Sequence, residues 1–204
     1  MPFNISTFKT NGLVYGGARP ALFKVILSVP NGINISNVSV SKFSFMCKAA
    51  SLPAAEIGVT PAGYFGRQIK LAGDRTFGDW AVTVNNDEDF SVRALFETWS
   101  NAINRLVSNV RDPVLATEEY KVDLEVIQYA KDGTEIRSYT MIGAWPTTIG
   151  EITLDWDTQN QIEQFGVTFA YDYWVPLLES SDKKAGGVNV YGGQTTIDGP
   201  LGPA

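Results

Sequence analysis

Residues 121–142 read KVDLEVIQYAKDGTEIRSYTMI, and this stretch decides the fold class. From Val122 to Val126, apolar residues occupy every second position and charged residues stand between them. That period is typical of a strand with one buried and one solvated face. Lys131–Gly133 then favours a hairpin turn, because Asp-Gly tolerates the positive φ that such turns need. The stretch therefore predicts two antiparallel strands, 121–126 and 134–142, joined by a tight turn.

Segments on both sides of this hairpin carry further strand patterns. The first is a nearly continuous apolar run, short enough for a buried strand, and most of the others alternate. These predicted strands are 23–29, 43–48, 65–71, 80–84, 152–156 and 165–173. Between two of them, Leu52–Gly63 is punctuated by glycine and proline and has no periodicity. We expect that segment to form a loop or an irregular extended hairpin arm.

One helix is predicted among the strands. Residues with helical spacing form its apolar face: Val92, Leu95, Phe96, Trp99, Ile103 and Leu106. Residues 85–87 offer N-cap candidates, and the acidic run Asp87–Asp89 suits the positive end of the helix dipole. We expect the helix to end near Ser108, because Pro113 stops any continuation. The whole pattern indicates a mainly β fold, an antiparallel β-sandwich or barrel with one flanking α-helix.

Composition divides the chain into three parts. Residues 1–17 are polar and glycine-rich and are expected to form an arm. Residues 18–178 hold the periodic segments and are long enough to bury the core of one domain. Residues 179–204 are rich in Gly, Ser, Thr and Pro, which predicts an extension that is ordered only on a partner. The N-terminus lacks the basic and apolar regions of a signal peptide, so we expect synthesis and assembly in a reducing cytoplasm.

The charge balance and residue counts disfavour several classes of function. The net charge is −6, and an acidic surface repels phosphate, so tight binding to nucleic acid is not expected. The chain contains no histidine, the commonest general base and the commonest metal ligand. Its single cysteine, Cys47, is in phase with Phe43 and Phe45, which predicts a buried thiol and no intrachain disulfide. We therefore expect a protein that is not an enzyme and holds no cofactor or metal.

Asp155 and Asp157 are the strongest candidates for a chemical site. If they lie two apart on a strand, their carboxylates face one way at about 6.6 Å along the chain. That arrangement suits the carboxylate pair of a glycosidase or a hard-metal site. The favoured interpretation is a solvated polar face opposite Ile152, Leu154 and Trp156, which form the apolar face of the same predicted strand.

The segment Ala72–Phe77, followed by Asp79 and Trp80, combines charges of alternating sign with aromatic residues. This mixture is typical of an ion-paired, packed joint within a fold or an interface. The segment also resembles the signature of the major tail tube proteins of contractile-tailed bacteriophages. Collinear matches follow the same family at residues 45–54, 83–84, 86–88, 145–146, 150–151, 154–157 and 171–174, so the resemblance spans about residues 18 to 174.

The resemblance implies hexameric rings that stack into a hollow tube inside a contractile sheath, with the genome passing through the tube. It also implies that inner sheets of neighbouring subunits join into one continuous β-barrel, and that the arm between the early strands bridges to adjacent subunits or rings. The partners it implies are further copies of the chain, the tail sheath protein, baseplate and tail terminator proteins, and a tape-measure protein in the lumen. Double-stranded DNA is expected to pass without specific binding, in a virion tail assembled in the host cytoplasm.

The residues predicted to lie at subunit or ring interfaces are Arg67, Asp74, Arg75, Phe77, Asp79, Trp80, Trp145, Asp155 and Asp157. Six copies at −6 each give about −36 per ring, which predicts a lumen of the same sign as DNA. Two alternatives share the fold: a tube-initiator or baseplate ring subunit, and a type VI secretion-like tube protein that passes effectors. A carboxylate-dependent hydrolase is the alternative from another class.

Overall fold

The computed structural model describes residues 4–13, 17–33, 37–111 and 119–177. The chain divides into two compact units, one of which spans Ala18–Leu178. Of the other unit, the structure describes helix α1 (Ile5–Asn11), whose first turn is capped by Asn4 Oδ1 accepting a hydrogen bond from Ser6 N at 3.0 Å. The arm expected over residues 1–17 therefore contains a short helix, and the predicted extension 179–204 lies outside the described residues.

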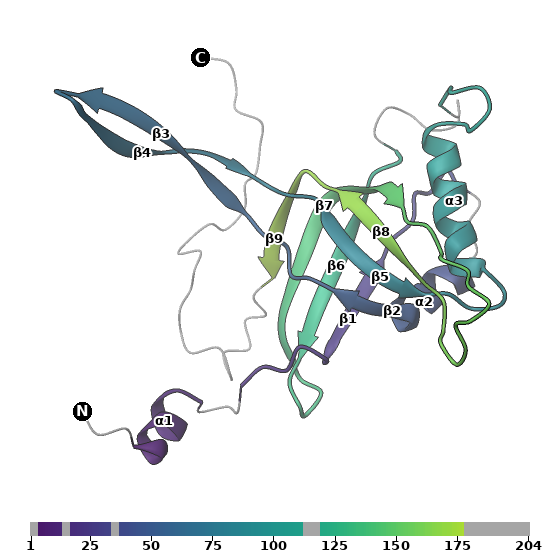
Figure 1. Cartoon of the computed structure of the whole chain (residues 1–204), viewed down its shortest axis with the longest axis horizontal. Helices are drawn as coiled ribbons and strands as arrows, with labels where there is room; N and C mark the ends of the chain where they lie inside the picture. The colour runs from purple at the N-terminus through teal and green to yellow at the C-terminus, as the bar shows by residue number, and fades with distance from the viewer. Residues whose placement is uncertain (1–3, 14–16, 34–36, 112–118, 178–204) are drawn as a thin grey trace. The chain divides into compact units, whose positions relative to one another are not determined.

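The larger unit is built on an antiparallel β-sandwich of seven strands (Figure 1), six of which follow one hydrogen-bonded path while β9 pairs with β7 beside that path. Strand β7 belongs to both layers. The first layer has the order β1-β6-β7-β9, and the second has the order β7-β8-β5-β2. The bounds are β1 (Phe23–Leu27), β2 (Cys47–Ala50), β5 (Trp80–Asn85), β6 (Val122–Tyr129), β7 (Glu135–Ile149), β8 (Gln164–Ala170) and β9 (Tyr173–Leu177).

Strand β7 can serve both layers because it bends near its middle. Gly143 has φ +68°, and a Cβ at this position would collide with the Asp172 carboxylate. Its amide donates to Asp123 Oδ1 at 3.1 Å, and the pairing register shifts again between Pro146 and Thr148. The part before the bend pairs with β6 and β9, Ala144 just after it still pairs with Val122 of β6, and residues 145–149 pair with β8.

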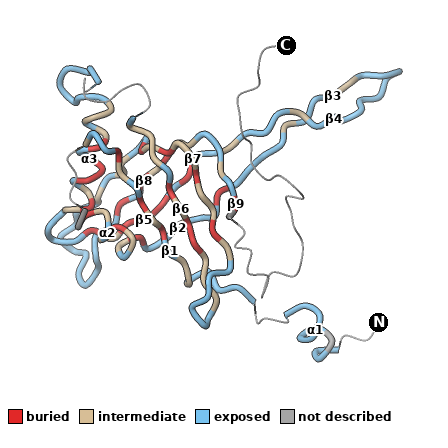
Figure 2. Tube along the Cα trace, turned by 180° about the vertical axis from the view of Figure 1, so that it is seen from behind, coloured by how far each residue is buried: buried red, intermediate tan, exposed pale blue. Residues whose placement is uncertain are grey.

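Two helices close one side of the sandwich: α2 (Asn37–Met46) and α3 (Ser91–Ile103). Figure 2 shows the buried residues gathered between the sheet layers and these helices. Phe96 of α3 is fully buried, and its ring centroid lies 5.5 Å from Phe43 of α2 and 5.8 Å from Phe169 of β8. Trp99 completes the contact by donating from Nε1 to the Tyr120 carbonyl at 3.0 Å. No helix in the described ranges combines the length and apolar character needed to cross a membrane.

Helix α2 corrects the predicted strand 43–48, because only Cys47 and Lys48 of that stretch lie in β2. Phe43 and Phe45 do not share a buried face, as a strand would require: Phe43 is buried in the core and Phe45 is 85% exposed. Lys42 pairs with Asp87 and Asp89 just before α3, so tertiary contacts override the local strand pattern. Cys47 is buried as predicted, and burial raises the pKa of its thiol to about 12.

The predicted helix exists but is shorter. It begins at Ser91, whose amide donates to Asp89 Oδ1 at 3.0 Å, so the acidic run lies at the positive end of the helix dipole as predicted. The predicted N-cap at residues 85–87 is wrong, because those residues lie too far before Ser91. It ends at Ile103 and not near Ser108, because the next residues form a separate turn closed by Arg105 N donating to the Val110 carbonyl at 3.0 Å. Pro113, which was expected to stop the helix, lies outside the described residues.

The hairpin predicted over residues 121–142 is confirmed. Gly133 has φ +83°, and β6 and β7 pair antiparallel with Leu124 opposite Met141. The returning strand continues beyond residue 142 to Ile149, and the predicted strand 165–173 separates into β8 and β9. The predicted strand 152–156 is wrong: those residues lie in an exposed loop, with Leu154 77% and Trp156 99% exposed.

Candidate assembly interface

Strands β3 (Glu56–Tyr64) and β4 (Arg67–Thr76) form a two-stranded sheet of their own. Figure 1 shows this hairpin projecting from the sandwich. Its nine-residue first strand gives a reach of about 30 Å. The tip turns at Phe65 and Gly66, with φ +44° and +79°. Of the two interpretations of Leu52–Gly63, the irregular extended hairpin arm is therefore confirmed, and the irregularity is a shift in the pairing register between Ile57 and Val59.

The hairpin exposes large apolar side chains. Those about half or more exposed are Ile57, Val59, Tyr64, Phe65, Ile69 and Leu71. The cross-strand pairs Tyr64–Arg67 and Ala62–Ile69 share one face, because paired residues of an antiparallel ladder point the same way. An isolated two-stranded hairpin is marginally stable in water, and exposed apolar patches mark interaction surfaces. The hairpin therefore has the character of one half of an interface.

The base of the hairpin is attached firmly to the sandwich. Trp80 Nε1 donates to the Ser51 carbonyl at 2.6 Å, and Trp174 Nε1 donates to the Ala54 carbonyl at 3.1 Å. The Phe77 ring packs between Tyr171 and Trp174, with centroids at 6.2 Å and 6.3 Å. Burial, and then the nearby Asp79 carboxylate, raises the pKa of Tyr171. These contacts hold the base of the arm while its tip stays exposed.

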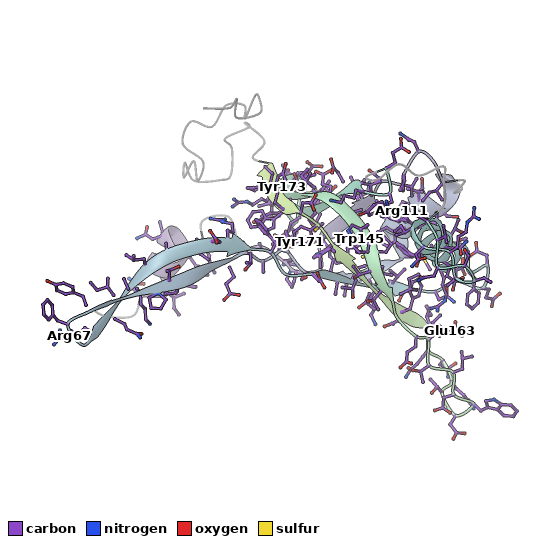
Figure 3. All side chains as sticks on the ribbon, turned by 90° about the horizontal axis from the view of Figure 1, so that it is seen from above. Arg67, Arg111, Trp145, Glu163, Tyr171 and Tyr173 are labelled. Atoms are coloured by element: carbon purple, nitrogen blue, oxygen red, sulfur yellow. The ribbon has the colours of Figure 1, made fainter. Side chains whose placement is uncertain are left out.

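A polar groove lies at the other end of the unit. Its volume is about 830 Å³, and it is bordered by the loop 150–163 and by the adjoining ends of β2, β5 and β8. The acidic residues in its lining are Glu151, Asp155 and Glu163, and the basic one is Lys48. Glu163 anchors the loop, because its carbonyl accepts from Asn86 N at 2.8 Å and its Oε2 accepts from Asn86 Nδ2 at 3.0 Å. Figure 3 shows Glu163 beside this loop and Arg67 at the far tip of the hairpin.

Asp155 and Asp157 do not form the parallel carboxylate pair that a shared strand face would produce. Asp155 Oδ1 accepts a hydrogen bond from Asp157 N at 3.0 Å, and Asp155 Oδ2 accepts from Thr158 Oγ1 at 3.3 Å. The carboxylate of Asp155 thus caps a turn in an exposed loop. Across the ranges that the structure describes, no group of three acidic, cysteine or histidine side chains is placed to hold a metal ion.

A family model described as phage tail tube protein matches residues 18–177. The chain belongs to the phage tail tube protein family. It is 41% identical over 158 residues to tail tube protein gp19 of Enterobacteria phage T4, covering 77% of this chain and 90% of that relative. A similar fold occurs in a chain of the anti-feeding prophage baseplate, with 14% identity, a TM-score of 0.55 and coverage of 79% of this chain and 95% of that one. Another occurs in the PVC sheath–tube complex of an extracellular contractile injection system, with 15% identity, a TM-score of 0.50 and coverage of 87% of this chain and 100% of that one.

The protein is therefore a structural tail tube subunit and a component of the phage virion tail. Its mainly β fold agrees with the one that the sequence predicted. The resemblance that the Asp-Arg-Thr-Phe and Trp-Asp motifs carried is confirmed by the family match and the T4 relative.

The residues predicted for interfaces lie in separate parts of this tail tube subunit. Arg67, Asp74 and Arg75 are exposed on the hairpin, and Asp155 and Asp157 are exposed on the groove loop. Of the remaining four, Asp79 is exposed, and three pack within the subunit: Phe77, Trp80 and Trp145. Trp80 is 1% exposed and packs on Phe169 in the core, so its side chain faces its own subunit. The Trp145 ring meets Tyr120 edge-on at 5.8 Å.

The sequence did not predict the groove, and it did not predict that residues 56–64 and 67–76 pair with each other. Glu151 belongs to a family match, but no sequence pattern places it near Glu163. The two residues line one surface only because the loop between them folds back to the end of β5. The hairpin left a signal that could have been used. Phe65-Gly66 separates two stretches of similar length, and Gly at a tip with positive φ is a hairpin feature.

Proposed function

We propose that this tail tube subunit closes into hexameric rings that stack into the hollow inner tube of a contractile tail. The observation that carries the proposal is the β3–β4 hairpin, with its exposed apolar face and a tip about 30 Å from its base. A surface of this kind needs a partner, and in a self-assembling protein the partner is another copy. Family membership supports the same arrangement, with the hairpin bridging adjacent subunits or rings.

We infer that the partners are those of a contractile tail. The similar folds come from a baseplate and from a sheath–tube complex of contractile injection systems. By analogy, the outer surface of the tube would contact a sheath protein, and its two ends would contact baseplate and terminator proteins. A tape-measure protein would occupy the lumen before the genome does. Assembly in the host cytoplasm fits the single buried thiol, Cys47, which needs no oxidising compartment.

The tube would serve as a conduit for genome ejection and would carry out no catalytic step. The absence of histidine from the sequence supports a non-enzymatic role. DNA would move without specific binding, because counterion release requires cationic contacts and a ring of six subunits carries about −36. A cryo-EM map of the tube with a lumen lined by lysine and arginine would contradict the charge argument.

Negative-stain microscopy of the overexpressed, concentrated protein tests the assembly. We expect hollow tubes of stacked rings. Single rings that never stack would favour a tube-initiator or baseplate ring subunit, a second candidate that the baseplate chain of similar fold supports. A protein that stays monomeric at every concentration, including after mixing with preformed tail baseplates, would overturn both.

A further inference from the structure

We propose that the acidic groove formed by the loop 150–163 is the receptor for the β3–β4 hairpin tip of a second copy of this chain. The inference rests on the proposed function, because it requires that copies assemble. It adds the particular surface that receives the arm and the chemistry by which that surface recognises it.

The two surfaces have opposite charge. The tip half of the hairpin carries Arg67 and Lys70, both exposed, and the acidic side chains of the hairpin, Glu56 and Asp74, lie toward its base. The groove lining carries three carboxylates against one ammonium group, that of Lys48. Opposite charges at an interface increase the rate of encounter and specify the partner. A basic tip and an acidic groove are therefore matched in sign within one sequence.

The two surfaces also match in apolar character. The face of the hairpin that bears Arg67 also bears Tyr64 and Ile69, which are 66% and 53% exposed. The groove is lined in part by Leu154 and Ile162, which are 77% and 66% exposed in the isolated subunit. The apolar side chains of both surfaces would be removed from water on docking, and burial of apolar surface provides the main favourable term of association. An apolar centre with a charged rim is the usual anatomy of a protein interface.

Position excludes a contact within one subunit. The hairpin leaves the sandwich on one side, and the loop 150–163 lies on the opposite side, as Arg67 and Glu163 mark in Figure 3. The base of the hairpin is held by the Trp80 and Trp174 indole groups, so the arm cannot fold back across the unit. Complementary surfaces at opposite ends make a head-to-tail contact, which repeats from copy to copy and generates rings or filaments.

Charge reversal tests the pairing. Arg67→Glu with Lys70→Glu should reduce the fraction of protein in rings and tubes at least tenfold. Glu151→Arg with Thr153→Arg should reduce assembly equally, because it makes the groove basic. These two positions are chosen because Asp155 and Glu163, whose hydrogen bonds hold the loop in shape, are then left intact. Combining all four substitutions restores opposite signs and should recover at least a third of the assembly. The matched control is Lys131→Glu, which makes the same charge change as Lys70→Glu but at the tip of the β6–β7 hairpin. The two single variants are compared with each other.

Cysteine cross-linking provides a second measurement that does not depend on weakened assembly. In a Cys47→Ser background, Phe65→Cys with Ile162→Cys should give a ladder of covalent multimers when oxidised, and Phe65→Cys with Val175→Cys should not. A ladder together with rescue supports the proposal. Rings or tubes that show neither a ladder nor rescue would place the receptor elsewhere and leave the proposed assembly standing. Unsubstituted protein that forms neither rings nor tubes would overturn both.

Discussion

The molecule contains two antiparallel hairpins with tight, glycine-containing turns, and they have opposite environments. In β6–β7, Leu124, Val126 and Met141 are at most 2% exposed. In β3–β4, no residue is buried and nearly all are exposed. The ladder hydrogen bonds are of the same kind, so backbone pairing does not distinguish the two. The hairpins differ in whether other elements of the same subunit cover one of their faces. One hairpin therefore stabilises the subunit, and the other is available for assembly.

Removing the exposed hairpin should have the largest effect on assembly. Replacing residues 57–75 by a short Asn-Gly turn deletes the arm but keeps the anchored base, since Trp80 and Trp174 bond to residues outside the deletion. We expect no rings or tubes by electron microscopy and a monomer that still unfolds cooperatively. Shortening the turn at Lys131–Gly133 by one residue is the contrasting variant. A deletion variant that still forms tubes would show that the arm is dispensable.

Leucine truncation separates the two hairpins by stability. Leu124→Ala removes a fully buried side chain and should lower the free energy of unfolding by about 2–5 kcal/mol. Leu71→Ala, on the exposed hairpin, should change it by less than about 0.5 kcal/mol in the monomer. Urea titration of monomeric protein measures both. Equal losses at the two positions would mean that the hairpin packs against its own subunit.

The indole of Trp174 should tie the hairpin base to the sandwich. Trp174→Phe keeps a ring beside Phe77 and Tyr139 but removes the donor to the Ala54 carbonyl, a loss of about 1 kcal/mol. We expect faster amide exchange in the hairpin and weaker tube formation, with little change in exchange of β6 and β7. Uniformly faster exchange across both hairpins would instead indicate a general loss of stability.

The smallest effect is expected at the ion pairs between Lys42 of α2 and the carboxylates just before α3. The Lys42 ammonium lowers the pKa of Asp89 to about 2, so this contact stabilises the fold above the ordinary aspartate pKa of 3.8 and is lost as pH falls toward 2. Thermal unfolding from pH 6 to pH 2 should show a steeper loss of Tm in the unsubstituted protein than in Lys42→Met. Parallel curves for the two proteins would rule out this contribution.

Local chemistry in the sequence determined much of this protein. The alternation in 121–126 and the Asp-Gly turn specify the β6–β7 hairpin, and the spacing from Val92 to Trp99 specifies the buried face of α3. The collinear motifs around Asp74 and Asp155 identified the tail tube family. These features depend on neighbours within about one turn or one strand, so they can be read from short windows.

Tertiary structure alone decided which periodic segments are covered. Phe43 and Phe45 alternate like a strand, yet they lie in α2, because Phe96 and the Asp87–Asp89 carboxylates stabilise a helix there. Leu154 and Trp156 alternate in the same way but lie in an exposed loop, because no strand of the subunit pairs with that segment in the described structure. A period of two shows only that a segment has two faces. Whether one face is buried depends on residues far away in the chain, and for the hairpin we propose that it depends on another copy.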